Sequence, residues 1–423
     1  MNKIDGKTIK VPEEVRAIMD TLVSSGYEAY CVGGCVRDSL LGRAPEDWDI
    51  TTSALPEQVK SLFSNTVDTG IQHGTVMIVI RGIGYEVTTY RIDGKYLDGR
   101  HPEHVTFTRS LEEDLKRRDF TINAFAYNDG SGIVDLFDGM DDLEKKIVRA
   151  VGDPDARFTE DALRIMRAIR FAAQLDFKVE EETYAAIRRH ADNLANVSME
   201  RIRVEFEKTL MSRNCGMVNE FFRLGMGDYI LPGYAEKCAG FDEEIAACLP
   251  GEQEDDARRY LLLAILLKEL SAEEAKDALR AMKYDNKTKA AVSAILRYKD
   301  APLQADRARI KKALNEMGEE VFFLEADLQE AITRAGMDGL TKCQDDVTLS
   351  TFALVREMAE DIIAKHEPFS TTHLAVNGND LIRAGVPEGV QLKEELEALL
   401  ERVIRDPGLN TKEQLMELLR GKS

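Results

Sequence analysis

The sequence predicts an α+β protein, with a mixed-sheet head over residues 1–150 and an all-α remainder of roughly twice that length. In the head, short apolar runs are bounded by glycine or proline, as is typical of alternating strands and short helices. From about residue 153, apolar residues recur at helical spacing, with short Gly, Pro or Asn breaks. The 423 residues contain no repeat of fixed period and no low-complexity tract.

The elements of the head follow from local patterns. The apolar run 29–32 (AYCV) predicts a buried strand that Gly33-Gly34 interrupts, and CVRDSLL predicts a helix that ends at Gly42. The further elements are a strand at 48–51 (WDIT), a helix at 55–63 (LPEQVKSLF) with Pro56 in its first turn, and strands at 74–80 and 85–91 that RGIG joins into a hairpin. The polar stretch 92–105 is too rich in Gly, Asp and His for regular structure, so a working loop is expected.

Composition indicates an ordinary soluble protein, with 44% hydrophobic and 31% charged residues. No apolar run approaches the length of a membrane span, and the N-terminal stretch lacks an apolar signal region, so a cytoplasmic location is expected. The six cysteines form no C-x-x-C pair. Cys31 and Cys35 are therefore expected to be buried, reduced thiols rather than part of a zinc site.

The charge distribution along the chain bears on whether the protein binds nucleic acid. The formal net charge of −20 by itself argues against nucleic acid, because phosphate binding is driven by Lys and Arg. Residues 283–312, however, hold nine Lys and Arg against three Asp, a local charge of +6. This stretch is either a solvated helical face or a phosphate-binding surface, in which Lys311 and Lys312 are candidate contacts.

The turn GGCVRD (33–38) is the first candidate for chemistry. A strand that enters a Gly-Gly turn and then a helix exposes backbone N–H groups, and these groups favour phosphate. Gly34 allows close approach, and Arg37 can reach a phosphate oxygen from the first turns of the helix. The alternative, for Gly-Gly alone, is a plain tight turn.

Two carboxylates follow in the segment DWDIT. Asp47 and Asp49 are two residues apart at the start of a predicted strand, so both side chains are expected on one face. Two such carboxylates beside a triphosphate suit Mg²⁺, whereas a lone D-x-D is also typical of a solvated strand end. Asp47 and Asp49 are thus the candidate catalytic metal ligands, and Glu86 on the hairpin is a candidate third carboxylate.

Paired arginines precede an acid in the segment RRDFTINAFAY (117–127). A helix start capped by Asp119 accounts for the acid but not for the arginines. The alternative interpretation is that Arg118 holds a triphosphate or a base, and that Asp119 accepts a hydrogen bond from a ribose hydroxyl.

A helix predicted over residues 159–175 carries the last group. Asp161, Arg164 and Arg167 follow one another at i, i+3 spacing on one face, and Arg170 continues the series. The alternative is an i, i+4 salt bridge from Glu160 to Arg164 beside a solvated basic ridge.

In this order, the segments resemble the class II tRNA nucleotidyltransferases, the CCA-adding enzymes, in their compact bacterial form. The resemblance covers the first 210 residues and the tail segment VNGNDLIRAGV, and it is carried by VGGCVRDSLLG, DWDITT, HGTV, YEVTTYR, SLEEDLKRRDFTINAFA, VRAVGDPDARFTEDALRIMRAIRFAAQL and SMERIRVEFEKTL. It implies a nucleotidyltransferase head (1–150), a helical nucleotide-selecting neck (151–210), a helical body (211–312) and a helical, tRNA-binding tail (313–423).

The resemblance implies template-independent addition and repair of the 3′-terminal CCA of tRNA from CTP and ATP, with Mg²⁺ as cofactor and pyrophosphate as product. It also allows a homodimer, and no membrane partner is expected. Asp47 and Asp49 are implied to bind the metal, and the nucleotide contacts are implied at Gly34, Arg37, Arg118, Asp119, Asp161, Arg164, Arg167 and Arg170.

The choice of base has a physical basis. Cytosine and adenine both present an exocyclic amine donor beside a ring-nitrogen acceptor, whereas uracil and guanine present the reverse. A carboxylate next to a guanidinium offers an acceptor and then a donor, so Asp161 with Arg164 is expected to accept C and A. A wrong base leaves buried polar groups unpaired, a mismatch that a site can reject by about 10⁴-fold or more.

Three alternative functions are compatible with the same chemistry or the same fold. A poly(A) polymerase is disfavoured because TTYR leads into IDGKYLDGRHP rather than a Gly-Arg-Arg-Phe type of sequence, and a non-catalytic RNA-binding relative would be expected to lose a metal carboxylate. A partial enzyme that adds only A or only CC stays open.

In the resembling family a loop at 92–105 is needed for the A step. Here that stretch carries Asp98 and Arg100, which are expected to brace the pocket, with His101 where a second arginine is common.

Overall fold

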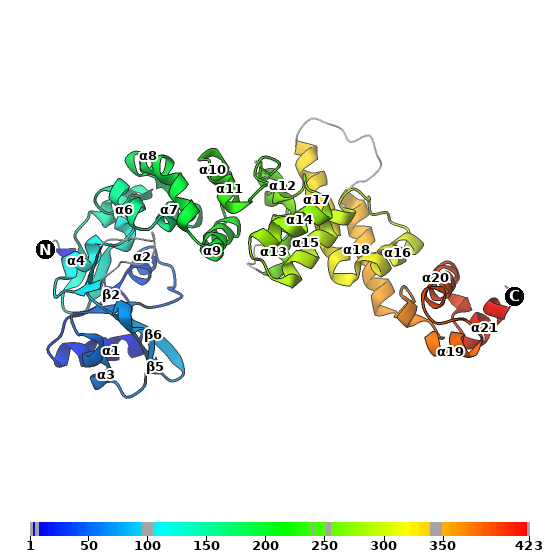
Figure 1. Ribbon diagram of the computed structural model, residues 1–423, viewed down its shortest axis with the longest axis horizontal. Helices are drawn as coiled ribbons and strands as arrows, with labels where there is room; N and C mark the ends of the chain where they lie inside the picture. The colour runs from blue at the N-terminus through cyan, green and yellow to red at the C-terminus, as the bar shows by residue number, and fades with distance from the viewer. Residues whose placement is uncertain are drawn as a thin grey trace. The chain divides into compact units, whose positions relative to one another are not determined.

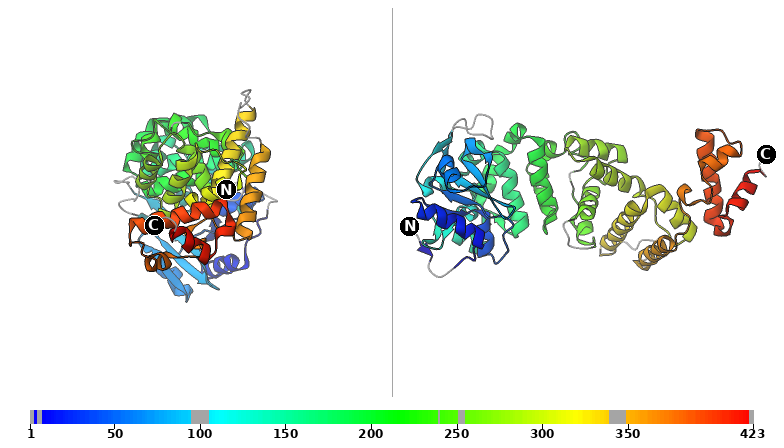
Figure 2. Two further views of the ribbon diagram at one scale, coloured as in Figure 1. Left: turned by 90° about the vertical axis from the view of Figure 1, so that its right-hand side faces the viewer. Right: turned by 90° about the horizontal axis from the view of Figure 1, so that it is seen from below.

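A computed structural model describes residues 3–4, 8–94, 105–238, 240–250, 255–338 and 349–420. The chain divides into two compact units, residues 1–239 and 240–423. The strands belong to the N-terminal part of the chain, and the described residues of the yellow to red part form helices but no strand (Figure 1), as two further views also show (Figure 2). The division into head, neck, body and tail is finer than these two units and stays a prediction.

Eight strands form one sheet in the order β1-β10-β9-β2-β3-β6-β5-β4. Only β3 and β6 pair in parallel, and the other neighbours in this sheet are antiparallel, so the predicted mixed sheet is confirmed. The bounds are β1 Lys3–Ile4, β2 Ala29–Val32, β3 Ile50–Thr52, β4 Thr66–Gly70, β5 Thr75–Ile80, β6 Ile83–Thr89, β9 Phe125–Asn128 and β10 Gly132–Asp135. Two small sheets pair β7 (Arg91–Asp93) with β8 (Val105–Phe107), antiparallel, and β11 (Ile147–Val148) with β12 (Lys178–Val179), parallel.

The helices of the first unit are short. They are α1 Glu13–Ser24, α2 Gly34–Leu40, α3 Pro56–Leu62, α4 Leu111–Lys116, α5 Gly139–Lys145, α6 Pro154–Glu160, α7 Leu163–Leu175, α8 Glu181–His190, α9 Met199–Leu210, α10 Val218–Arg223 and α11 Gly227–Ile230. Short 3₁₀ helices are η1 Ile71–His73, η2 Thr121–Asn123, η3 Ala191–Asn196 and η4 Cys215–Met217.

Both faces of the large sheet are covered, which follows from the alternation of side chains along a strand. In β2, Ala29 and Cys31 belong to the core that also contains α1 and α3, whereas Tyr30 and Val32 belong to a second core with residues of α4. Cys31 and Cys35 are buried, and burial raises the pKa of both thiols, that of Cys35 to about 12. The expected buried thiols are confirmed.

The predicted hairpin is formed by β5 and β6, with Ile80 paired to Ile83. The turn residues Arg81 and Gly82 have φ of 51° and 83°, as a two-residue hairpin turn of the primed type requires. The stretch 92–105 begins and ends in the paired strands β7 and β8, so its ends are regular, contrary to the expectation. Asp98, Arg100 and His101 lie outside the described residues.

Two local predictions were wrong. The strand expected at 48–51 begins only at Ile50, so Asp47 and Asp49 precede β3. The single helix expected over 159–175 is two helices, because α6 ends at Glu160 and Asp161 is extended, with φ −140° and ψ 104°. The Asp161 carboxylate accepts a hydrogen bond from the backbone N–H of Leu163 (3.0 Å), a local bond that competes with helix continuation.

The second unit is helical throughout its described residues. Its elements are α12 Glu243–Ala247, α13 Asp256–Leu266, α14 Ala272–Ala281, α15 Asn286–Tyr298, α16 Arg307–Met317, α17 Glu319–Asp338, α18 Leu349–Ala364, η5 Thr371–His373, α19 Gly378–Arg383, α20 Val390–Arg405, η6 Pro407–Leu409 and α21 Lys412–Arg420. One core lies among α16, α17 and α18, and another among α19, α20 and α21. No described helix has the length and apolar character needed to cross a membrane.

The basic stretch 283–312 is only partly exposed. Lys311 is 1% exposed, and its Nζ lies 2.8 Å from Glu367. Arg307 pairs with Asp361 at 2.7 Å and also with Glu367. These two cations fix α16 against α18 and the segment after it, so the expectation that Lys311 contacts phosphate is wrong. Lys312 remains exposed on the surface of α16.

Candidate active site

The turn after β2 brings an arginine close to the backbone. Gly33 has φ +81°, and a β-carbon built on it would lie 3.0 Å from Nη1 of Arg118. Any other residue would therefore be strained and would press on that guanidinium. The N–H of Val32 donates to the carbonyl of Asp49 (3.0 Å), which fixes the DWD segment beside this turn. The helix predicted over CVRDSLL is present as α2, which begins one residue earlier, at Gly34.

Three carboxylates gather at this end of the sheet. In the parallel pairing of β3 and β6, Ile50 is opposite Val87, so Asp49 and Glu86 each lie one residue before a paired position. Protein surrounding the Asp49 carboxylate raises its pKa to about 6, Arg118 opposes the shift, and the negative charges of Asp47 and Glu86 add to it. Among the described residues, no three His, Cys, Asp or Glu side chains converge closely enough to hold a metal by themselves.

Arg37 is almost buried, with 8% exposure. Its Nε and Nη2 each donate to the Asp38 carboxylate at 2.9 Å, and its Nη1 donates to Oδ1 of Asn123 at 2.6 Å. A guanidinium has five N–H groups, so these three bonds leave donors available. The neighbouring acid and Asn123 therefore orient Arg37 without saturating it.

Asp119 is the centre of the polar contacts and is 9% exposed. Its Oδ1 accepts from the backbone N–H of Phe120 (2.8 Å) and from Asn123 (3.1 Å), and its Oδ2 accepts from Nε and Nη2 of Arg167 (2.8 and 2.6 Å). Although burial alone would raise the pKa of Asp119, Arg167 and Asn123 lower it well below the ordinary range. Four N–H groups thus already donate to this carboxylate. The expected hydrogen bond from a ribose hydroxyl to Asp119 stays a prediction.

The two residues expected to read the base each have another partner. Nη2 of Arg201, on α9, donates to the Asp161 carboxylate at 2.9 Å. Arg164 donates to Glu160 at 2.7 Å and to the carbonyl of Arg117 at 2.9 Å. The i, i+4 salt bridge considered as an alternative is therefore present. The break at Asp161 also means that this residue does not share a helix face with Arg164.

Arg167 and Arg170 share one carboxylate from the neighbouring helix. Glu205, on α9, lies 2.9 Å from Nε of Arg170 and 3.8 Å from Nη1 of Arg167. Burial lowers the pKa of Arg170 to about 10, Glu205 opposes the shift, and Arg167 and Arg37 add to it. The predicted arginines of α7 are thus brought next to Arg37 of the head.

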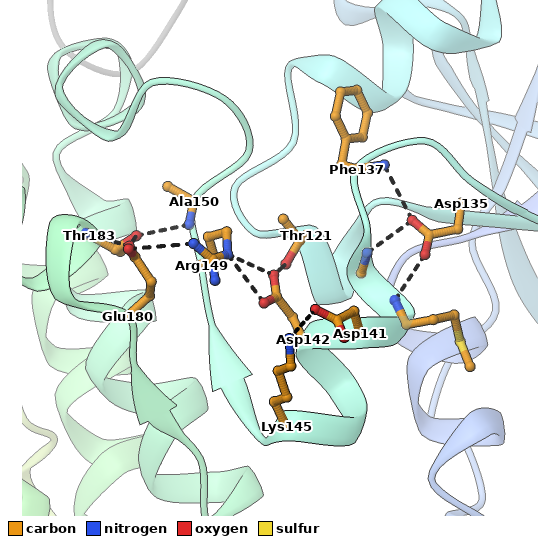
Figure 3. Close-up of polar contacts among 12 residues, drawn as sticks. Thr121, Asp135, Phe137, Asp141, Asp142, Lys145, Arg149, Ala150, Glu180 and Thr183 are labelled. Atoms are coloured by element: carbon orange, nitrogen blue, oxygen red, sulfur yellow. Dashed lines mark hydrogen bonds and ion pairs between the residues drawn. The ribbon is translucent and has the colours of Figure 1, made fainter. Parts of the chain in front are cut away.

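A polar junction anchors the turn that carries Asn123. Asp142 accepts from the hydroxyl of Thr121 (2.7 Å) and from Nε of Arg149 (3.1 Å), as Figure 3 shows. Arg149 also lies 3.4 Å from Glu180, which caps α8 by accepting from Thr183 (2.8 Å). The 3₁₀ turn η2 is thereby tied through α5 to the start of α8.

Three protein-family models match the chain. They are the Poly A polymerase head domain over residues 29–149, the RNA and SrmB-binding site of polymerase A over 176–238, and tRNA nucleotidyltransferase domain 2 over 252–419. The CCA-adding enzyme of Pediococcus pentosaceus is 39% identical over 397 residues, which cover 93% of this chain and 94% of that enzyme. The chain belongs to the CCA-adding enzyme family.

Two further relatives of this family support the assignment. The CCA-adding enzyme of Leuconostoc mesenteroides is 53% identical over 233 residues, which cover 54% of this chain and 57% of that enzyme. The crystal structure of Bacillus stearothermophilus CCA-adding enzyme in complex with CTP has a TM-score of 0.79 and 34% identity, covering 97% of this chain and 98% of that one. The predicted fold and family are thus confirmed.

Three residues of the candidate site, Asn123, Arg201 and Glu205, are not among the residues predicted from the sequence. They lie within the segments that carry the family resemblance. The signal was weak, because each acts on a residue that lies elsewhere in the chain, such as Arg201 on Asp161, 40 positions away. Gly33 was noted only as part of a Gly-Gly pair, whereas its own φ and its contact with Arg118 set the turn.

Proposed function

We propose that this chain adds C, C and A in turn to the 3′ end of tRNA, with CTP and ATP as donors, in the cytoplasm where these substrates occur. The observation that carries the proposal is one connected cluster. Asp49 is bonded to Val32 beside the Gly33 turn, Arg118 lies against that turn, and the adjacent Asp119 holds Arg167. The proposal assigns the carboxylates of this cluster to a metal and its arginines to a triphosphate, and the similarity to CCA-adding enzymes supports tRNA, CTP and ATP as the substrates.

The carboxylate oxygens of Asp47 and Asp49 fit Mg²⁺, which prefers a few carboxylates completed by water and substrate phosphate oxygens. Two protein ligands with Glu86 nearby suit such a partly open site better than a closed protein cage. When bound there, Mg²⁺ would neutralise charge on the triphosphate and favour attack by the terminal hydroxyl of the tRNA.

The other residues bind and orient the nucleotide. Four arginines bind the triphosphate: Arg37, Arg118, Arg167 and Arg170. They position the α-phosphate for attack by the 3′ hydroxyl and stabilise the negative charge of the departing pyrophosphate. Asp161, held by Arg201, accepts from the exocyclic amine of C or A. Arg164 donates to the ring nitrogen through N–H groups that its described bonds do not use.

The test uses tRNA substrates that end before the CCA, after the first C, or after both C residues. Each labelled nucleoside triphosphate is supplied in turn with Mg²⁺, and product lengths are measured. Addition of C, C and A to the first substrate supports the proposal. Extension of only the last substrate, by A alone, would identify a partial A-adding enzyme, and long A tails would identify a poly(A) polymerase.

A further inference from the structure

One aromatic ring lies among three arginines of the candidate site. Phe171, on α7, is 5% exposed. The Cζ atoms of Arg37, Arg167 and Arg170 lie 5.0, 5.2 and 4.1 Å from the centre of its ring. Arg37 comes from α2 of the head and the other two from α7, so the ring is where these two parts of the first unit meet.

Carboxylates alone do not account for this convergence. Arg37 forms an ion pair with Asp38, Arg167 with Asp119 and Arg170 with Glu205. Glu205 is also 3.8 Å from Arg167, but none of these acids is paired with all three guanidiniums in the described ion pairs. The three cations nevertheless share one ring. Burial is the main cause of the lowered pKa of Arg170, and the charges of Arg167 and Arg37 add to it.

We propose that Phe171 is a positioning residue for the triphosphate of the bound nucleotide: its ring gathers the three guanidiniums and keeps their free N–H groups available. An aromatic ring attracts cations within about 6 Å through its quadrupole, and it accepts no ordinary hydrogen bond from them. A further carboxylate at this place would consume N–H donors and repel phosphate. The ring therefore stabilises the cations without competing with the ligand.

The ring itself is fixed by a neighbour that serves as a control. Phe120 packs edge-to-face on Phe171, with the ring centres 5.8 Å apart and the planes at 81°. Phe120 is fully buried, and among the described residues no arginine is placed over its ring. Replacing either phenylalanine by leucine removes the same ring pair, but only Phe171→Leu removes the contacts with arginine.

The experiment compares Phe171→Leu and Phe120→Leu in the full chain. The dissociation constant of inorganic triphosphate is measured by calorimetry, and the KM and kcat values for CTP, ATP and UTP are measured on tRNA. We expect Phe171→Leu to raise the triphosphate dissociation constant and the KM values for CTP and ATP by about tenfold, with kcat and the preference for CTP over UTP nearly unchanged. Phe120→Leu should change the triphosphate dissociation constant less than about twofold.

If both variants weaken triphosphate binding equally, ring packing rather than the contact with arginine matters, and the proposal is overturned. Unchanged triphosphate binding in Phe171→Leu would also overturn it. If Phe171→Leu does not fold by circular dichroism, Phe171→Met supplies a second side chain without a ring. The inference rests on the proposed function, yet the two fail separately. A wild-type chain that binds triphosphate but adds no nucleotide would refute the function, while calorimetry would still decide the role of Phe171.

Discussion

Replacing Asp119 by asparagine tests how the head holds the arginines of α7. The substitution keeps the shape of the side chain and removes its charge. Arg167 then loses its 2.6 and 2.8 Å bonds to a carboxylate and keeps only the more distant Glu205, at 3.8 Å. The new amide must also turn its NH₂ group toward either Arg167 or the donors from Phe120 and Asn123.

The size of the effect follows from burial. Removing one partner of a buried charge pair costs about 3–5 kcal/mol. Because the Arg167 side chain is 32% exposed and water can solvate part of it, the lower end, about 3 kcal/mol, is expected. For a unit of this size, each kcal/mol lowers the melting temperature by about 2–4 °C, so the first unit should melt about 6–12 °C lower at pH 7.

The pH dependence gives a second readout. Since folding lowers the pKa of Asp119, its charge stabilises the fold above the unfolded pKa of about 4. This stabilisation is lost as the pH falls toward the folded pKa. The difference between wild type and Asp119→Asn should therefore be full at pH 7 and shrink below about pH 4.

The assay is thermal unfolding of the two proteins, followed by circular dichroism at several pH values. A double-mutant cycle with Arg167→Gln should give a coupling energy of about 2 kcal/mol. Equal melting temperatures at pH 7, or a coupling near zero, would refute the claim that this ion pair holds α7 to the head. The control is Asp141→Asn, whose exposed pair with Lys145 should contribute almost nothing.

Four further outcomes are expected. Asp49→Ala should abolish incorporation of both CMP and AMP while leaving tRNA affinity nearly intact, and substantial residual turnover would remove Asp49 from the metal site. Asp161→Ala should lower discrimination against UTP and GTP as well as the overall rate; unchanged misincorporation ratios would leave it a structural residue. Reversing the exposed Arg309 and Lys312 to Glu should weaken tRNA binding and flatten its salt dependence by about one unit of log–log slope or less per lost contact, and an unaltered slope would make this a solvated face. Burial raises the pKa of Glu325 to about 7, so its ionisation destabilises the fold above the unfolded pKa of about 4.5. Glu325→Gln should therefore stabilise the second unit by up to about 3 kcal/mol at pH 8 and by nothing below pH 4.5. Denaturant titrations at both pH values would measure this difference.

Local patterns were enough for much of the head. The strand 29–32, the turn at Gly33-Gly34 and the hairpin of strands 74–80 and 85–91 were predicted because each depends on short-range alternation and on the backbone freedom of glycine, and the structure has the hairpin at 75–89. The residue types and spacing also single out carboxylates and arginines as candidate contacts for a metal and a triphosphate. The sequence by itself thus determined the short elements of the head, and its assignment of metal and triphosphate contacts stays a prediction.

Only the tertiary structure decided which of these residues meet. The helix expected over 159–175 breaks at Asp161, whose carboxylate is bonded to Arg201 from a later helix. Lys311 looked like a surface cation, but Glu367 draws it into the interior of the second unit. Asp119 and Arg167 are 48 positions apart and yet form the central ion pair. The physical reason is the same in each case: a charged side chain takes its nearest desolvated partner in space, and that distance is set by packing rather than by position along the chain.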